Sequence, residues 1–376
     1  MIYLDHNATT SVSPEVLEAM MPYLTTEWGN PSSSYEFGSK LKMAVEKARN
    51  QVAQLLGANS REILFTSCAT ESNNTAFHAS LKANPAKRHI ITSGVEHSSV
   101  INDCMALEKE GYKVTYLPVD RDGLLKIVDL ETAITTETAI VSLMWANNET
   151  GVVFPISDIA QVCKARGVLF HCDAVQAVGK IEIDLGKIQA DYLSVAGHKF
   201  NAPKGVGALF VRNKAPFSPL IRGGHQERGR RGGTESVPLI VGVGKAAELA
   251  RKKLLKYDVN VRPTRDALEN GILRSIPNTE LNGHSTQRLA NTTSITFHGI
   301  EAESLLLLLN RYGICASSGS ACLADSEEPS HVIKAMKPDN GASRQTVRFS
   351  LGTDNTLIDI NAVLNKIRSA VQSLKC

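Results

Sequence analysis

The 376-residue sequence lacks the marks of several classes of protein. No apolar run reaches the roughly 18 residues that a membrane-spanning helix needs, and the first residues, MIYLDHNATT, contain no basic stretch followed by an apolar core. The net charge of +3 is too small to indicate nucleic acid as a partner. There is also no internal repeat and no low-complexity linker. We therefore expect a cytoplasmic globular protein that binds neither a membrane nor nucleic acid.

The seven cysteines lack the spacing of a metal site or of a redox pair. None belongs to a Cys-x-x-Cys pair, and an odd number scattered through apolar runs argues against a disulfide framework. We expect reduced thiols, as in a cytosol, and no resident metal.

Short apolar runs alternate with helical patterns along most of the chain. Seven runs are expected to form strands, at 62–66, 89–92, 114–119, 139–145, 168–172, 192–195 and 208–211. This alternation predicts an α/β fold with a mostly parallel seven-stranded sheet and helices on both faces. A long charged helix at about 237–257 then leads into a smaller lobe of helices and strands.

The most informative stretch is AGHKFNAPKGVG, residues 196–207. Lys199 follows a predicted strand and lies between a histidine and a turn rich in proline and glycine. A lysine amine in such a pocket can hold an aldehyde cofactor as a Schiff base, because amine and carbonyl must meet away from bulk water. Pyridoxal 5'-phosphate (PLP) is the obvious candidate, whereas a solvated surface lysine is the ordinary alternative.

The segment VLFHCDAVQAVG predicts a buried strand that ends at Asp173. A carboxylate at the carboxyl end of such a strand points into the ligand crevice of an α/β sheet. There it would pair with the pyridine nitrogen of PLP, and Gln176, one turn further on, could reach the ring hydroxyl. Taken alone, Asp173 would be interpreted as the cap of the next helix.

Two further segments carry polar residues directly after predicted strands. EILFTSCATES predicts a polar helix start whose free amides and hydroxyls form a phosphate site, with Ala69 and Thr70 as ligands. An ordinary helix cap would use the same residue types. In VEHSSV, His97 could stack on a pyridine ring or transfer protons near pH 7, although a structural histidine is the alternative.

Cys322 lies in ASSGSACLADSEEPSHV, a stretch of small residues followed by acidic ones. No apolar periodicity covers residues 317–330, which predicts an exposed, mobile loop rather than a helix or strand. A free thiol with a pKa of ~8.5 is only slightly ionised at pH 7, yet its thiolate is a strong nucleophile. Such a thiol could take sulfur from a PLP-bound substrate and carry it to an acceptor, whereas most isolated cysteines are buried and structural.

Together these segments resemble the NifS-type cysteine desulfurases, which are class V aminotransferases and fold-type I PLP enzymes. The matching stretches run from end to end and include YLDHNATT, GNPSS, FTSCATES, VEHSSV, MWANNETG, HCDAVQAVGK, AGHKFNAPKGVGALF, RGGHQERGRRGGTES, ASSGSACLADSEEPSHV and TVRFSLG. The resemblance implies a large PLP-binding domain at 15–257. It also implies a small domain, made of 1–14 and 258–376, that carries the cysteine loop.

The resemblance implies four contacts to the cofactor ring. Lys199 matches the Schiff-base lysine, Asp173 matches the partner of the pyridine nitrogen, and Gln176 matches the partner of the ring oxygen. His97 matches the stacking histidine, which also serves as a catalytic proton carrier.

Phosphate ligands follow from the same resemblance. Thr70 and His198 match two of them, and Thr234 matches one that the partner subunit supplies, which implies a homodimer with its sites at the interface. The basic stretch at 222–231 is then an interface loop. One departure is Ala196, where many desulfurases have a phosphate-binding serine; either Ser194 or a backbone amide would replace that serine.

The resemblance also implies the reaction. Asn148 and Arg348 match the residues that hold the substrate, and Asn148 also contacts the cofactor; an arginine fork suits an amino-acid carboxylate. L-cysteine would react at Lys199-bound PLP, and Cys322 would attack the substrate sulfur, which leaves alanine and a persulfide. The persulfide would supply sulfur for Fe–S cluster assembly through a scaffold or another acceptor protein. Cys322 would contact the Fe–S cluster or the scaffold transiently.

Three alternatives remain open at this stage. The chain could be a non-catalytic sulfur-transfer partner that keeps the fold, although intact Lys199, Asp173 and Cys322 argue against this. It could be a selenocysteine lyase or a related PLP lyase, for which Cys322 would matter less. The acceptor is also open, because nitrogenase maturation, general Fe–S assembly and thiolation share the same chemistry.

Overall fold

The computed structural model describes residues 1–318, 329–338 and 341–375. Its centre is a seven-stranded sheet in the order β2-β8-β7-β6-β5-β3-β4, in which β8 runs antiparallel to both of its neighbours. The predicted α/β fold and its mostly parallel sheet are therefore confirmed. The strands are β2 (Ile63–Thr66), β3 (His89–Ser93), β4 (Lys113–Leu117), β5 (Thr138–Met144), β6 (Leu169–Asp173), β7 (Tyr192–Ala196) and β8 (Gly207–Val211).

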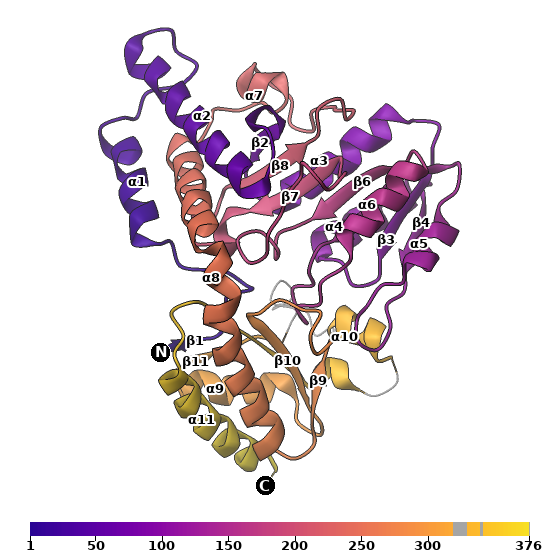
Figure 1. The fold of residues 1–376 in the computed structure, drawn as a ribbon, viewed down its shortest axis with the longest axis vertical. Helices are drawn as coiled ribbons and strands as arrows, with labels where there is room; N and C mark the ends of the chain where they lie inside the picture. The colour runs from indigo at the N-terminus through magenta and orange to yellow at the C-terminus, as the bar shows by residue number, and fades with distance from the viewer. Residues whose placement is uncertain (319–328, 339–340, 376) are drawn as a thin grey trace.

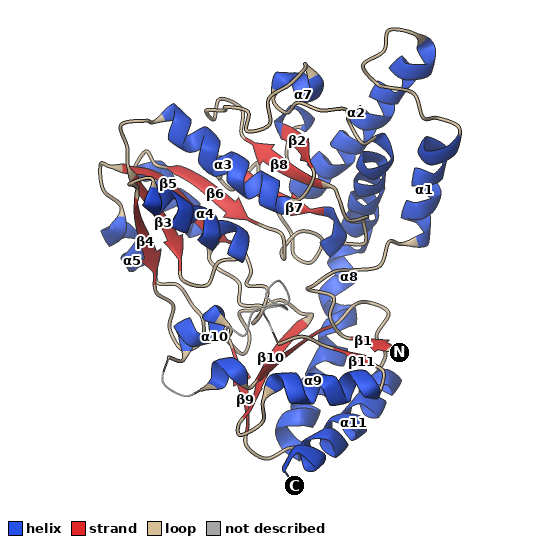
Figure 2. Ribbon diagram, turned by 180° about the vertical axis from the view of Figure 1, so that it is seen from behind, coloured by secondary structure: helices blue, strands red, loops and turns tan. Residues whose placement is uncertain are grey.

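Helices cover both faces of this sheet. Figure 1 looks onto the face with α6, and Figure 2 shows α3 across the opposite face. All seven residues of β5 are buried, because a strand covered on both faces needs apolar side chains on both. The helices of this part are α1 (Pro14–Thr25), α2 (Glu36–Leu56), α3 (Ala69–Ala83), α4 (Ser98–Lys109), α5 (Ile127–Ala133), α6 (Ile156–Ala165) and α7 (Gln226–Gly229).

A smaller lobe lies below the sheet in Figure 1 and contains both chain termini. It has an antiparallel sheet in the order β12-β10-β9 and a parallel pair that joins β1 to β11. Its elements are β1 (Ile2–Tyr3), β9 (Thr279–Asn282), β10 (Thr292–Phe297), α9 (Ala302–Arg311), β11 (Ile314–Cys315), α10 (His331–Met336), β12 (Thr346–Ser350) and α11 (Leu357–Lys375).

Helix α8 (Val237–Ser275) connects the two parts and is longer than the sequence analysis predicted. The predicted end near Tyr257 is wrong, because no glycine follows that residue and the helix continues through Pro263. Its amino-terminal half packs on α1 and α2, and its carboxyl-terminal half packs on α11. Within the described ranges, no helix is both long and apolar enough to cross a membrane.

Two separate groups of buried side chains underlie these two parts. The larger surrounds the main sheet, and the smaller contains Leu4, Leu268 and Phe349. We infer that these groups correspond to the two expected domains, 15–257 and 1–14 with 258–376. One element departs from that division, since Val332 and Ile333 of α10 pack with the larger group.

Two glycines that end helices allow a matched test of this packing. Gly57 after α2 and Gly167 after α6 both have positive φ, at 59° and 63°. A Cβ on Gly57 would lie 2.9 Å from the Asp184 Cα, whereas a Cβ on Gly167 would meet nothing within 4 Å. We expect Gly167→Ala to lower the free energy of unfolding by about 1 kcal/mol, through its left-handed backbone alone.

Gly57→Ala should lower the free energy of unfolding by a further 1–3 kcal/mol or so, because the methyl group must also displace backbone. Urea unfolding followed by circular dichroism measures both losses. Equal losses for the two variants would contradict the close approach of Gly57 to Asp184.

Candidate functional site

A cavity of about 360 Å³ lies at the carboxyl ends of the main-sheet strands. This is where an α/β sheet usually binds its ligand, since the loops after successive parallel strands converge there. Asp173 ends β6, Lys199 follows β7, and His97 follows β3. The sequence-predicted residues that line the cavity are Ala69, Thr70, His97, Asn148, Asp173, Gln176, His198, Lys199 and Arg348.

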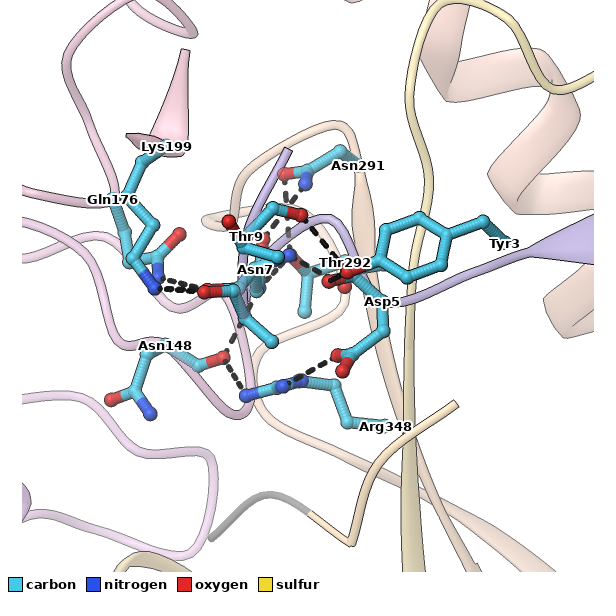
Figure 3. A network of polar contacts seen from close by, with 12 residues as sticks. Tyr3, Asp5, Asn7, Thr9, Asn148, Gln176, Lys199, Asn291, Thr292 and Arg348 are labelled. Atoms are coloured by element: carbon cyan, nitrogen blue, oxygen red, sulfur yellow. Dashed lines mark hydrogen bonds and ion pairs between the residues drawn. The ribbon is translucent and has the colours of Figure 1, made fainter. Parts of the chain in front are cut away.

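Lys199 ends a short 3-10 turn, η2 (Gly197–Lys199), directly after β7. Its Nζ donates hydrogen bonds to the backbone oxygens of Asn7 and Ala8, at 2.6 and 2.8 Å. Figure 3 shows Lys199 and Gln176 converging on Asn7 from the same side. The lysine is therefore held by carbonyl groups of the amino-terminal segment and its amine lines the cavity.

Asp173 is 5% exposed, and its carboxylate is held in position by a second buried side chain. Oδ2 accepts a hydrogen bond from Asn73 Nδ2 at 2.9 Å, and Oδ1 accepts one from the Val175 backbone at 3.0 Å. The same Asn73 nitrogen also donates to the Ser99 hydroxyl, at 2.9 Å. Asn73 thus couples the carboxylate to the start of α4, a contact that the sequence analysis missed.

His97 caps the start of α4 with its side chain. Nδ1 accepts a hydrogen bond from the Ser99 backbone amide at 3.1 Å and lies 2.8 Å from the Ser99 hydroxyl. Because Nδ1 accepts from that backbone amide it carries no proton, so the Ser99 hydroxyl donates to Nδ1. In its neutral form the ring therefore carries its proton on Nε2.

The amino terminus of α3 forms the third wall of the cavity. Its cap residue, Cys68, has no side-chain hydrogen bond to the first turn, so the exposed first amides of the helix are available to an anion. Glu71 fixes this turn, because it accepts from Ser67 and forms an ion pair with Arg231 at 3.0 Å. This arrangement suits a phosphate at Ala69 and Thr70.

His198 and Ala196 lie on the same side of the cavity. Burial and the neighbouring Lys199 lower the pKa of His198 to about 4, so the ring is neutral near pH 7. Its Nδ1 lies 3.1 Å from the Thr9 hydroxyl. Ser194 is fully buried and its hydroxyl bonds His171, so a backbone amide is the better replacement for the serine that Ala196 lacks.

Arg348, on β12, is 2% exposed, and polar contacts at the edge of the cavity orient its guanidinium. One terminal nitrogen donates to Asp5 Oδ1 at 2.7 Å, and the other donates to the backbone oxygen of Asn148 at 3.0 Å. Asp5 keeps the charge of this buried guanidinium balanced. The fork is thereby oriented beside Asn148, as the substrate role requires.

Asn7 connects several residues at the cavity, although no local pattern in the sequence identified it. It is 1% exposed, and both its backbone and its side chain bond residues from each of the two parts of the chain. Its partners are Asn148, Gln176, Lys180, Lys199, Asn291, Thr292 and Ser350. The quoted motif YLDHNATT contains Asn7 and was the signal that could have found it.

One predicted residue that the structure describes, Thr234, does not line the cavity, and another, Cys322, is not described. Thr234 is exposed and does not line the cavity, so its proposed phosphate contact stays a prediction. Cys322 lies outside the described residues. In the part of the chain that the structure describes, no cluster of His, Cys, Asp or Glu side chains could hold a metal ion.

The residues present fit PLP. Its aldehyde would meet the Lys199 amine, its pyridine nitrogen the Asp173 carboxylate, and its phosphate the amino terminus of α3. The class of protein that this fold and site define is the fold-type I PLP enzyme.

Comparison with known proteins places the chain within that class. The family model described as aminotransferase class-V matches residues 2–363. "Cysteine desulfurase 2" of Trichormus variabilis is 55% identical over all of this chain and 94% of its own length. "Cysteine desulfurase NifS" of Azotobacter vinelandii is 49% identical, again over all of this chain and 93% of its own. The chain belongs to the class-V aminotransferase family, whose cofactor is PLP.

A solved structure agrees with this assignment. A "NifS-like protein" superposes with a TM-score of 0.93 at 38% identity, covering 99% of this chain and all of the other. The expected resemblance and the fold-type I architecture are therefore confirmed.

The buried histidine behind Asp173 gives a pH test of the site. His171 is fully buried between the hydroxyls of Ser142 and Ser194, and burial lowers its pKa from 6.5 to about 4. Below pH 6.5 the unfolded chain binds a proton that the folded chain does not, so folded-state stability falls as the pH falls. Between pH 6.5 and 5 this residue should remove about 2 kcal/mol of stability.

In His171→Gln the loss of unfolding free energy on lowering the pH should be smaller by that amount, because glutamine does not titrate. The measurement is urea unfolding at several pH values between 7 and 5. His225→Gln, at an exposed position, is the control and should retain the wild-type slope. An unchanged slope in His171→Gln would show that this ring takes up its proton as readily in the folded protein as in the unfolded chain, which contradicts the lowered pKa.

Proposed function

We propose that this protein is a PLP-dependent cysteine desulfurase that converts L-cysteine to L-alanine and retains the sulfur as a persulfide on Cys322. The observation that carries the proposal is that Lys199, Asp173 and Arg348 line the same cavity. Relatives named cysteine desulfurase, about half identical over the whole chain, support the same reaction.

PLP supplies an electron sink for the bond broken at the substrate Cα. In this proposal Lys199 holds the cofactor and, once freed, moves the Cα proton with its Nζ. Asp173 keeps a proton on the cofactor nitrogen, and Asn73 holds that carboxylate in place. His97 covers the ring and presents its Nε2 to proton exchange.

Arg348 and Asn148 would bind the substrate carboxylate. The guanidinium is already oriented by Asp5 and by the Asn148 backbone oxygen, so little ordering remains when L-cysteine arrives. The carboxylate adds a second anionic partner to a buried cation, which is favourable because charge-assisted hydrogen bonds are strong. This contact would fix the orientation of the substrate at the cofactor.

The proposed destination of the sulfur is Fe–S cluster assembly, through a scaffold or another acceptor protein. A relative named NifS suits supply to nitrogenase, and one named IscS from Methanosarcina thermophila, 48% identical, stands equally close. We infer the cytoplasm as the compartment, because free thiols stay reduced there. The described free thiols are Cys68, Cys104, Cys163, Cys172 and Cys315.

We further propose a homodimer in which Thr234 reaches the phosphate of the partner's cofactor. In one protomer Thr234 is exposed, and its loop is fixed by the Arg231–Glu71 ion pair at the start of α3. A glycine-rich loop with an exposed hydroxyl beside a phosphate site is suited to completing a neighbouring site.

Cys322→Ala and Lys199→Ala should separate the two halves of the chemistry. Cys322→Ala should keep the visible absorption of bound PLP and its change on adding L-cysteine, while alanine release falls at least about 100-fold for want of a nucleophile. Lys199→Ala should lose Cα proton exchange itself. Absorption spectra and alanine assays measure both.

The controls are Lys204→Ala, on the same loop as Lys199, and Cys315→Ala, in β11; both should keep normal turnover. After borohydride reduction of the wild-type protein, the cofactor should be found covalently on Lys199. Wild-type turnover of L-cysteine by Cys322→Ala would instead establish the lyase alternative. A protein that stays colourless with PLP would establish the non-catalytic one.

Thr234→Ala should weaken PLP binding about tenfold or more, because a hydrogen bond to a charged group contributes about 1.5 kcal/mol or more. Ser236→Ala, two residues away and also exposed, is the matched control and should bind PLP normally. Equilibrium dialysis gives the affinity, and light scattering gives the oligomeric state. A monomer with full PLP affinity would contradict the shared site.

A further inference from the structure

Lys180 is a second buried lysine close to the cavity. It lies four residues after Gln176 and is 7% exposed. Its Nζ donates to Gln176 Oε1 at 2.7 Å and to Asn7 Oδ1 at 3.3 Å. Among described residues it is absent from the lining of the proposed cofactor cavity and lines a neighbouring cavity of about 420 Å³ instead. Lys180 therefore does not contact a ligand in that cavity, and it can act on the cofactor only through a neighbour or through its charge.

The two neighbours of the Gln176 amide leave it a single orientation. In its protonated form Lys180 can only donate, so the amide oxygen then faces Lys180. A backbone carbonyl can only accept, so the amide nitrogen must face the Asn7 oxygen, which it bonds at 3.0 Å. Gln176 thus presents an N–H donor, never its oxygen, on the side of Asn7 and Lys199 (Figure 3).

The charge of Lys180 depends on what occupies the site. Burial and the nearby Lys199 and Arg348 lower the pKa of Lys180 to about 7. Its two bonded acceptors are both neutral amides. An anionic ring oxygen or phosphate nearby would favour the protonated amine, because an opposite charge stabilises the ammonium form.

We propose that Lys180 is a positioning residue that fixes the Gln176 amide so that its N–H meets the ring oxygen of the cofactor and stabilises that oxygen in its ionised form. This inference rests on the proposed PLP site. Gln176 touches the cofactor, whereas Lys180 acts through Gln176 and through its positive charge. The visible absorption of bound PLP reports the ionisation of this ring system directly.

The test is a pH titration of the visible band of the holoprotein. In Lys180→Met the midpoint should rise by about 1 pH unit, and the PLP dissociation constant should rise about tenfold. Lys180→Gln, which can both donate and accept, should give a smaller rise. Lys164→Met is the matched control, since the exposed Lys164 makes the same kind of bond to a half-buried glutamine, Gln189, at 3.4 Å; its midpoint should stay unchanged.

A double-mutant cycle distinguishes positioning from general structural support. In a Gln176→Leu background, replacing Lys180 with methionine should shift the midpoint by less than half as much as in the wild type, because its route through the amide is gone. Equal shifts in both backgrounds, or no shift in Lys180→Met, would overturn the proposal while leaving the desulfurase function intact. Failure of the wild-type protein to bind PLP would overturn the proposed function itself.

Discussion

The amino-terminal segment holds the site together through one buried residue, Asn7. Its backbone oxygen accepts from Lys199 and Gln176, and its side-chain amide bonds Asn148 and residues on or next to β10. Buried polar groups are costly unless satisfied, so these bonds tolerate little rearrangement. The position of the lysine amine is consequently set by a residue nearly 200 positions away in the chain, and the two parts of the chain meet at that same point.

The charged groups around the cavity determine what kind of ligand the pocket favours. Lys199 and Arg348 lie close enough to Lys180 to lower its pKa. The carboxylates of Asp173 and Asp5 offset these charges only in part, and burial raises the pKa of the third carboxyl group, Glu149, which favours its neutral form. The nearby rings of His171 and His198 are neutral, because burial lowers both pKa values to about 4. A protein pocket with more buried cations than anions favours an anionic ligand. PLP with its phosphate, together with a substrate carboxylate, brings the negative charge that this pocket lacks.

The sequence predicted those features that depend on local pattern. All seven main-sheet strands were placed within a few residues, because buried parallel strands are short apolar runs, and the polar residues that follow them converge by topology. Asn7, Asn73 and Lys180 were missed as site residues. Each matters through contacts across long sequence separations, such as Asn73 to Asp173, which no periodicity reveals. The length of α8 was missed because the second half of this helix packs on β9, β10 and α11, which are distant in the sequence.

Residues at the cavity also bond the two described ends of the segment that contains Cys322. Ser317 pairs with the backbone of Arg348, at 2.7 and 3.2 Å, and Ser330 donates its hydroxyl to the buried carboxylate of Glu149 at 2.6 Å. Glu149 and Arg348 both line the cavity, so the chain enters and leaves the cysteine segment beside the cofactor site. Cys322 follows Ser317 by five residues, a reach of at most about 18 Å. Both described ends of this segment therefore lie at the cavity, which is the arrangement that the proposed transfer of sulfur from the substrate to Cys322 needs.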